Sequence, residues 1–241
     1  MKPAGKVVFC TPSLAGPTAP YIRSLEASIP LVKAAGWQEG YAQELQNPYI
    51  SAARALMTRR ALDAGADVIV YLDYDLSWDP EDLLKLIETE GDVVSGTYRF
   101  KKAEEEYMGV LSPTLDGRPI VRADGAVKAD WIPAGFLKIT KGALAAMMKA
   151  HPELMYGDPT RPHFDLFNHG AHNWTWYGED YAFSRRWGAM GGEIWLVPDL
   201  NITHWNGKEA FPGNFHRWLL RRPGGSESEN PMPHGNLRAV A

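Results

Sequence analysis

The first half of the chain alternates between continuous apolar runs and segments in which apolar residues recur at helical spacing. Residues 6–10 and 68–72 are solid runs of β-branched and aromatic side chains, which is typical of buried strands. Residues 21–29 and 50–64 have the spacing of helices, and we expect Pro30 to interrupt the first of them. Strands that alternate with helices predict a parallel sheet covered by helices.

A further helix and strand are predicted after residues 68–72. Asp79 and Pro80 form a strong helix start, because Asp caps free backbone N–H groups and Pro suits the first turn. We expect this helix to end near Gly91 and residues 92–96 to form the next strand. The order of elements therefore continues the α/β pattern.

The middle of the chain changes character. Residues 108–111, 119–122 and 126–132 are short apolar runs separated by Asp-Gly turns, a pattern that predicts antiparallel strands. Residues 136–139 then predict a strand, and the Ala- and Met-rich residues 141–150 predict a helix.

The last third begins with a segment that has no clear period. Residues 151–177 are rich in His, Pro, Asn, Gly and aromatic side chains, and we expect a long loop there. Residues 179–187 predict a helix and residues 193–197 a strand. Residues 223–241 are rich in Pro, Gly, Ser and Glu, which is typical of a flexible tail. The sequence therefore predicts one folded domain over residues 1–222.

Composition narrows the class of protein. The chain has 241 residues, of which 45% are hydrophobic and 22% charged, as in ordinary globular domains. Its formal net charge of -4 argues against a protein that wraps nucleic acid by bulk electrostatics, although a local basic groove is compatible with it. No stretch has the length of a membrane-spanning helix and no signal peptide is visible, so we expect a cytoplasmic protein. Cys10 lies in an apolar run, which predicts a buried, unreactive thiol.

Two carboxylates directly follow the buried run at 68–72. In an open parallel sheet, ligands bind beyond the carboxyl ends of the strands, where Asp73 and Asp75 would emerge. Their like charges repel each other, and a divalent cation that bridges them to a diphosphate would relieve the repulsion. Oxygen ligands favour Mg²⁺ or Mn²⁺. The alternative is a polar turn between the strand and the following helix.

Four segments occur in an order that resembles a known family. They are residues 68–75 (VIVYLDYD), 92–101 (DVVSGTYRFK), 133–139 (PAGFLKI) and 177–204, the last of which begins YGEDYAFSRRW. They resemble, in turn, the strand with the DXD motif, the next strand and its loop, a Gly-containing strand, and an acidic helix start followed by a strand and a His. In this order they are similar to nucleotide-sugar glycosyltransferases of the GT-A fold, in particular small bacterial and phage members related to family two. The likeness runs from about residue 7 to residue 204.

The resemblance implies an α/β fold of the GT-A, Rossmann-like type, with a mostly parallel sheet and a small antiparallel part in a single domain. It implies an enzyme that moves a hexose-like sugar from a UDP or GDP donor to an acceptor hydroxyl, with Mn²⁺ or Mg²⁺ as cofactor. Asp75 is implied to bind the metal, and Asp73 to contact the donor ribose or a metal-bound water. Together with Asp73 and Asp75, His204 would be the third protein ligand of the metal. The cation would neutralise the charge that develops on the departing nucleotide diphosphate.

The fourth segment places Glu179 and Asp180 in the first turn of a predicted helix. An inverting transfer needs a carboxylate that accepts the proton of the acceptor hydroxyl, and the resemblance implies that Asp180 is this base. In a retaining enzyme Asp180 would position the acceptor instead. The alternative for both residues is stabilisation of the helix N-terminus.

Other matches concern the nucleotide. Thr11, Pro12 and Arg54 resemble the lining of the nucleotide pocket. Gly135 is expected to let donor or acceptor approach the backbone closely. Many relatives carry Arg-Asn in the helix before the DXD strand, whereas this chain has Ala55 after Arg54, so the Asn contact is absent.

The acceptor class stays open at this stage. A glycan or lipid-linked saccharide is the usual target of the fold, and a hydroxymethylated pyrimidine in phage DNA is the alternative, which would place the protein in a host cytoplasm. The basic and aromatic run 216–222 suits contact with phosphates or, at the periphery of a membrane, with an anionic lipid surface. Arg99, Lys101 and Lys102 would hold phosphates or form a solvated charged loop.

Two further classes compete with a glycosyltransferase. A nucleotidyltransferase would need a Gly-rich phosphate loop followed by Lys, and residues 13–16 supply none. A non-catalytic module that binds nucleotide sugars is the third class. The donor sugar and the oligomeric state are not determined by the sequence.

Overall fold

The computed structural model describes residues 4–115 and 117–221, so the predicted tail at 223–241 lies outside the described residues. The elements are, in chain order, β1 (Gly5–Ser13), α1 (Ala19–Ala34), β2 (Trp37–Leu45), α2 (Ile50–Asp63), β3 (Val68–Leu72), β4 (Leu76–Trp78), α3 (Pro80–Glu88), β5 (Val93–Gly96), β6 (Val110–Leu111), β7 (Val127–Trp131), β8 (Phe136–Thr140), α4 (Lys141–Ala150), the short 3₁₀ helix η1 (Pro152–Leu154), β9 (Met155–Tyr156), β10 (His163–Phe164), β11 (Gly170–His172), β12 (Thr175–Tyr177), α5 (Glu179–Ala189), β13 (Ile194–Val197), β14 (Asn201–Asn206), β15 (Glu209–Asn214) and α6 (Phe215–Arg221).

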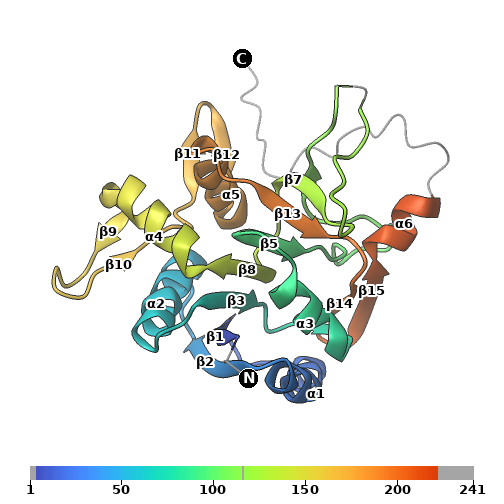
Figure 1. The fold of residues 1–241 in the computed structure, drawn as a ribbon, viewed down its shortest axis with the longest axis horizontal. Helices are drawn as coiled ribbons and strands as arrows, with labels where there is room; N and C mark the ends of the chain where they lie inside the picture. Colours follow the sequence, from blue (N-terminus) through green and yellow to red (C-terminus); the bar gives the residue numbers. More distant parts are fainter. Residues whose placement is uncertain (1–3, 116, 222–241) are drawn as a thin grey trace.

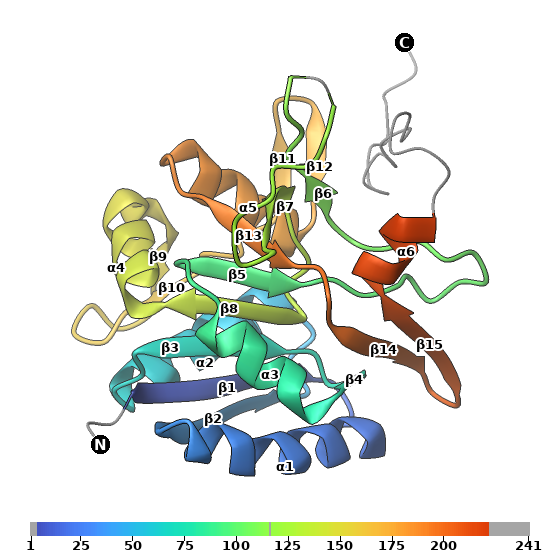
Figure 2. The same cartoon turned by 45° about the vertical axis from the view of Figure 1, so that its right-hand side comes forward.

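One eight-stranded sheet crosses the molecule in the order β2-β1-β3-β8-β5-β13-β7-β6 (Figure 1). Strands β8 and β7 run against the other strands of this sheet, because each pairs antiparallel with its neighbours. The predicted α/β fold, with a mostly parallel sheet and an antiparallel part, is therefore confirmed. A separate three-stranded sheet, β15-β14-β4, lies beside α6 (Figure 2).

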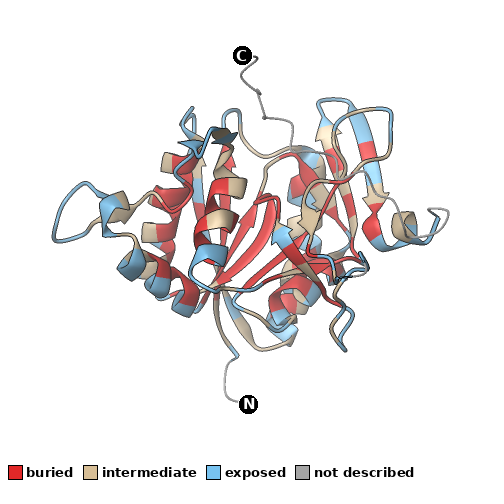
Figure 3. Ribbon diagram, turned by 90° about the horizontal axis from the view of Figure 1, so that it is seen from above, coloured by how far each residue is buried: buried red, intermediate tan, exposed pale blue. Residues whose placement is uncertain are grey.

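Helices cover both faces of the large sheet. Because successive side chains of a strand point to opposite faces, Val7 and Phe9 pack with α1 and α3, whereas Val8 and Cys10 pack with α2, α4 and α5. Figure 3 shows that the central strands are buried along most of their length. Burial also raises the pKa of the Cys10 thiol well above its ordinary value, which confirms the prediction of a buried, unreactive cysteine.

Two elements near the N-terminus differ from the sequence-based prediction. Helix α1 continues through Pro30 to Ala34, so the predicted interruption at Pro30 is wrong. Proline removes one helical hydrogen bond, but Tyr21 and Val32 pack in the same core on either side of it and hold the helix on the sheet. Strand β2 was not predicted, because its mostly polar edge residues lack an apolar run and the strand is defined by its pairing with β1.

The interpretation of residues 151–177 as a loop without secondary structure is also wrong. The segment contains η1 and two hairpins, β9–β10 and β11–β12. Leu166 and Phe167 between the hairpins are each 1% exposed and belong to the core. Trp174 at the tip of β11–β12 is instead fully exposed. The aromatic residues of this segment therefore serve both the core and the surface.

Among the described residues, no helix combines the length and the apolar character that crossing a bilayer requires.

The end of β5 is packed so closely that residue 96 must lack a side chain. A Cβ atom on Gly96 would lie 2.7 Å from Leu200 Cδ1, 2.9 Å from Ile202 Cδ1 and 2.9 Å from Phe136 Cδ1. We expect Gly96→Ala to lower the free energy of unfolding by about 1–3 kcal/mol, because overpacked core side chains must shift. Urea unfolding followed by circular dichroism measures the change.

Gly188 in α5 provides the matched control. A Cβ atom there would meet nothing within 4 Å. We expect Gly188→Ala to leave stability unchanged or to raise it by about 0.5–1 kcal/mol, since Ala favours the helix. Equal unfolding midpoints for the two variants would contradict the packing argument.

Candidate active site

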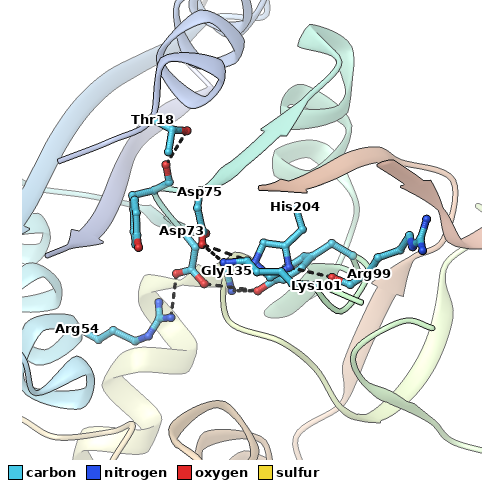
Figure 4. A network of polar contacts seen from close by, with 10 residues as sticks. Thr18, Arg54, Asp73, Asp75, Arg99, Lys101, Gly135 and His204 are labelled. Atoms are coloured by element: carbon cyan, nitrogen blue, oxygen red, sulfur yellow. Dashed lines mark hydrogen bonds and ion pairs between the residues drawn. The ribbon is translucent and has the colours of Figure 1, made fainter. Parts of the chain in front are cut away.

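Charged residues gather where β3 ends. The chain turns there across the start of β8, and the Asp73 N–H donates to the Gly135 carbonyl oxygen at 2.8 Å. On the other side, the Thr18 N–H donates to the Tyr74 carbonyl oxygen at 3.0 Å, which ties the start of α1 to the same turn (Figure 4). The turn that carries Asp73 and Asp75 is thus held by backbone hydrogen bonds from two directions.

The structure brings His204 to Asp75 through pairing of β14 with β4. His204 lies opposite Leu76 in this antiparallel pair, and the Trp205 N–H donates to the Asp75 carbonyl oxygen at 2.9 Å. The His204 Nε2 atom lies 3.7 Å from Asp75 Oδ2. Asp75 and His204, which are far apart in sequence, therefore lie next to each other at the edge of the site.

The hydrogen bond made by the other ring nitrogen of His204, Nδ1, determines the tautomer of the imidazole. Nδ1 lies 2.8 Å from the Arg99 carbonyl oxygen, which can only accept a hydrogen bond, so Nδ1 carries the hydrogen. Nε2 then faces Asp75, as a hydrogen-bond donor to the carboxylate when it carries a proton and with a lone pair available to a metal when it does not. A metal-binding His commonly has its second nitrogen bonded to a backbone carbonyl in this way.

Asp75 and His204 fit a divalent cation that is completed by a substrate. Mg²⁺ in nucleotide enzymes is usually bound by one or two carboxylates together with phosphate oxygens and water. Within residues 4–115 and 117–221, no cluster of three or more His, Cys, Asp or Glu side chains forms a metal site by itself. The protein would therefore supply Asp75 and His204, and a diphosphate and water would supply the remaining ligands.

Lys101 also contacts Asp75. Its ammonium group forms an ion pair with Asp75 Oδ2, the same oxygen that faces His204 (Figure 4). Burial alone would raise the pKa of Asp75, but hydrogen bonds from His204 and Lys101 hold this pKa below its ordinary value. Asp75 is therefore a carboxylate at neutral pH.

Asp73 faces a different cation, Arg54. The Arg54 side chain is almost fully buried, and its guanidinium lies 5.1 Å from the ring centre of Tyr71 and 5.3 Å from that of Phe167. Its NH2 atom donates to Asp73 Oδ1 at 3.1 Å, and its NH1 atom donates to the Ala134 carbonyl oxygen at 3.3 Å. The structure thus places Asp73 beside Arg54. Its predicted roles, as a metal ligand with Asp75 and His204 and as a contact to the donor ribose or a metal-bound water, stay predictions.

The first turn of α5 brings Glu179 and Asp180 to the same guanidinium. Glu179 Oε1 lies 4.0 Å from Arg54 NH2. Burial, followed by the charge of Glu179, raises the pKa of Asp180 to about 7. A carboxylate with this pKa is partly ionised at neutral pH and strong enough as a base to accept a proton from a bound hydroxyl.

Gly135 is needed for packing within the site. A Cβ atom there would lie 2.4 Å from Asp73 Oδ2 and 2.2 Å from the Tyr98 hydroxyl oxygen. The close approach at Gly135 is thus made by side chains of this chain, and an approach by donor or acceptor stays a prediction. Thr11 and Pro12 are buried at the end of β1, where the Thr11 hydroxyl forms a hydrogen bond with the Tyr21 hydroxyl. Their role in a nucleotide pocket also stays a prediction.

The sequence did not predict the side chains that contact Arg54, Asp73 and Asp75 and hold them in position. Tyr71 and Phe167 pack against Arg54, and the Tyr98 hydroxyl lies 3.5 Å from Asp73 Oδ2. Lys101 was considered only as a phosphate ligand or as part of a solvated loop. The pairing of β4 with β14 could not be predicted from the sequence, because β4 has only three residues and is too short to show a hydrophobic period.

Comparison with known proteins gives similarity of structure only. No protein-family model matches the chain, and no curated protein matches it. Three solved structures that resemble it are glycosyltransferases, the class that the four sequence segments resemble. GalNAc-T7 with UDP, GalNAc and Mn²⁺ has a TM-score of 0.49 and 12% identity, and the match covers 85% of this chain and 46% of that one. Residues 1–349 of TarS from S. aureus have a TM-score of 0.44 and 11% identity, with 80% of this chain and 58% of that one covered. A glycosyltransferase involved in the glycosylation of the major capsid of PBCV-1 has a TM-score of 0.34 and 11% identity, with 61% of this chain and 67% of that one covered.

This chain spans about half the length of the first two of these proteins. Because all three TM-scores are below 0.5, the proposals that follow rest on the residues and geometry of this chain.

The raised pKa of Asp180 predicts a pH-dependent cost to stability. A carboxyl group whose pKa is higher in the folded state binds its proton more tightly there, so stability falls as pH rises from about 4 to 7. Asp180→Asn removes this cost, and we expect it to raise the free energy of unfolding by about 4 kcal/mol at pH 8 and by little at pH 4. Urea unfolding at both pH values measures the difference. A gain of the same size at pH 4 would contradict the assignment.

Proposed function

We propose that this chain is a metal-dependent glycosyltransferase that moves a sugar from a UDP- or GDP-sugar to a hydroxyl of a glycan or lipid-linked saccharide with inversion. The observation that carries the proposal is the gathering of two kinds of group at one edge of the sheet. Asp75 and His204 suit a cation, and Asp180 suits a base. Asp73 and Arg54 lie between them, because Arg54 contacts Asp73 and reaches to within 4.0 Å of Glu179.

Asp75 and His204 would act on the leaving group through the cation that they hold. A bound Mn²⁺ or Mg²⁺ would neutralise the negative charge that develops on the released nucleotide diphosphate. In this chain Asp75 and His204 would hold it, with the hydrogen bond from His204 Nδ1 to the Arg99 carbonyl fixing the direction of Nε2. Arg54 packs against the rings of Tyr71 and Phe167 and carries a permanent positive charge, which suits it to hold Asp73 in place beside the donor.

The base side serves the acceptor. Inversion requires a proton acceptor on the face of the sugar opposite the leaving group. Asp180 begins α5 across Arg54 from the cation pair, and its pKa of about 7 suits proton transfer near neutrality. Glu179 contributes through its charge, which raises the pKa of Asp180.

The acceptor surface is provided by the β11–β12 hairpin, which leads directly into α5. Trp176 is 57% exposed on this hairpin, and Trp174 at its tip is fully exposed. Both Asn173 and Trp174 have positive φ values, of 47° and 65°, so the tight turn holds a large ring out into solvent. Exposed indole faces suit the apolar faces of sugar rings, which favours a saccharide acceptor.

Donor hydrolysis and transfer test the proposal directly. Purified chain is incubated with UDP- and GDP-sugars, with Mn²⁺ or EDTA, and with oligosaccharides or hydroxymethylated DNA as acceptors. We expect release of UDP or GDP that needs Mn²⁺ and falls by about 100-fold or more in Asp75→Asn, because the cation loses its charged ligand.

Asp79→Asn is the matched control for that experiment. Asp79 lies on the same stretch of chain, but its carboxylate accepts a hydrogen bond from the Asn201 amide. We expect this variant to keep wild-type activity. Mn²⁺-dependent release at an equal rate in Asp75→Asn would show that the cation site is assigned wrongly, and transfer to DNA but not to saccharides would overturn the acceptor class.

The pH profile tests the base. Since Asp180 accepts a proton only when ionised, we expect kcat/KM to rise about tenfold per pH unit below about 7 and to level off above it. Asp180→Asn should lower kcat by about 10²–10⁴-fold. Glu179→Gln should move the midpoint to lower pH, because the charge of Glu179 raises the pKa of Asp180. A profile that is unchanged in Asp180→Asn would exclude this residue as the base.

A further inference from the structure

Lys101 occupies the position at Asp75 that a cation would take. It comes from the segment between β5 and β6, and its ammonium contacts Asp75 Oδ2. The same oxygen lies 3.7 Å from His204 Nε2. The Asp75 side chain is only 12% exposed, so water compensates this carboxylate poorly and Lys101 is its main counter-charge.

An ammonium and a divalent cation cannot both stay on this oxygen. A metal ion bound to Asp75 and His204 would lie within a few ångströms of the Lys101 nitrogen, and like charges at that distance repel strongly in a partly buried site. One of the two must therefore leave when the other binds. Lys101 is able to leave, because its side chain is 32% exposed and its four-carbon stem is flexible.

The backbone around Lys101 is fixed, so the movement is confined to the side chain. Arg99 NH2 donates to the carbonyl oxygens of Lys102 and Ala103 at 3.3 and 3.0 Å. The Phe100 N–H donates to the Glu106 carbonyl oxygen at 3.0 Å, and the Arg99 carbonyl accepts from His204. An ammonium released from Asp75 thus stays near the site, where a diphosphate on the cation would lie.

We propose that Lys101 and the divalent cation exchange at Asp75, an inference that rests on the proposed function. In the free protein Lys101 neutralises Asp75. With a cation held by Asp75 and His204 and a nucleotide diphosphate bound, the Lys101 ammonium would leave Asp75 and contact a phosphate oxygen. Lys101 is then a donor-binding residue that also sets how strongly the free protein binds metal.

Mn²⁺ binding to the purified full chain tests the exchange without any turnover. The variant Lys101→Met keeps the aliphatic stem and removes the charge. The control is Lys102→Met, because Lys102 is paired with Glu106 and does not contact Asp75. Electron paramagnetic resonance of free Mn²⁺ gives the Kd for metal alone, and calorimetry gives the Kd for UDP and for GDP with Mn²⁺ present.

We expect Lys101→Met to bind Mn²⁺ alone about tenfold more tightly than the wild type, because the competing charge is gone. With Mn²⁺ present, the same variant should bind UDP or GDP about tenfold more weakly, because the phosphate contact is lost. Lys102→Met should match the wild type in its affinity for Mn²⁺ alone. Adding Asp75→Asn to Lys101→Met should abolish the gain in Mn²⁺ affinity.

Other outcomes would overturn the exchange. If Lys101→Met binds Mn²⁺ no more tightly than the wild type, or if Lys102→Met shows the same gain, Lys101 does not compete with the cation. When the wild type still binds UDP or GDP and transfers sugar, such a result removes the exchange and leaves the proposed function intact. If the wild type binds neither nucleotide nor Mn²⁺, the proposed function fails and the exchange fails with it.

Discussion

A buried guanidinium at the end of β3 is the constraint on which the site depends. Removing a charge from water is costly unless the charge is paired and hydrogen-bonded, and Arg54 is almost fully buried. The aromatic rings of Tyr71 and Phe167 pack against it, and Asp73 lies nearer to it than Glu179 does. The position of Asp73 follows from this pair. Asp75, two residues further along a turn held by backbone hydrogen bonds, is consequently directed elsewhere, toward His204.

The site as a whole contains more negative than positive charge, and this imbalance explains its chemistry. Glu179 and Asp180 add two carboxyl groups to the Asp73–Asp75 pair, and burial, followed by the charge of Glu179, raises the pKa of Asp180 to about 7. The permanent positive charge of Arg54 compensates the carboxylate of Asp73. The ammonium of Lys101, on a flexible side chain, compensates the carboxylate of Asp75. A site built in this way would offer one carboxylate to accept a proton and another to hold a cation, which are the two requirements of the proposed transfer.

Much of the fold could be predicted from local patterns, and the candidate site only in part. The run at 68–72, the helix at 141–150 and the α/β order were predicted correctly, because apolar periodicity and helix-start residues act over a few positions. The hairpins within 151–177 and strand β2 were missed, because they are defined by pairing and have weak patterns of their own. The residues named for the site came from a resemblance in motif order, which selects side chains and leaves their partners undetermined.

The sequence by itself determined which segments form buried strands and helices and that two aspartates emerge at the carboxyl end of β3. These properties depend on neighbours in the chain. Only the tertiary structure decided which cation faces which carboxylate. Arg54 meets Asp73 across 19 residues and Lys101 meets Asp75 across 26, while His204 arrives through a ladder between β4 and β14. Such contacts depend on the register of strands and the direction of buried side chains, and packing of the complete core sets both.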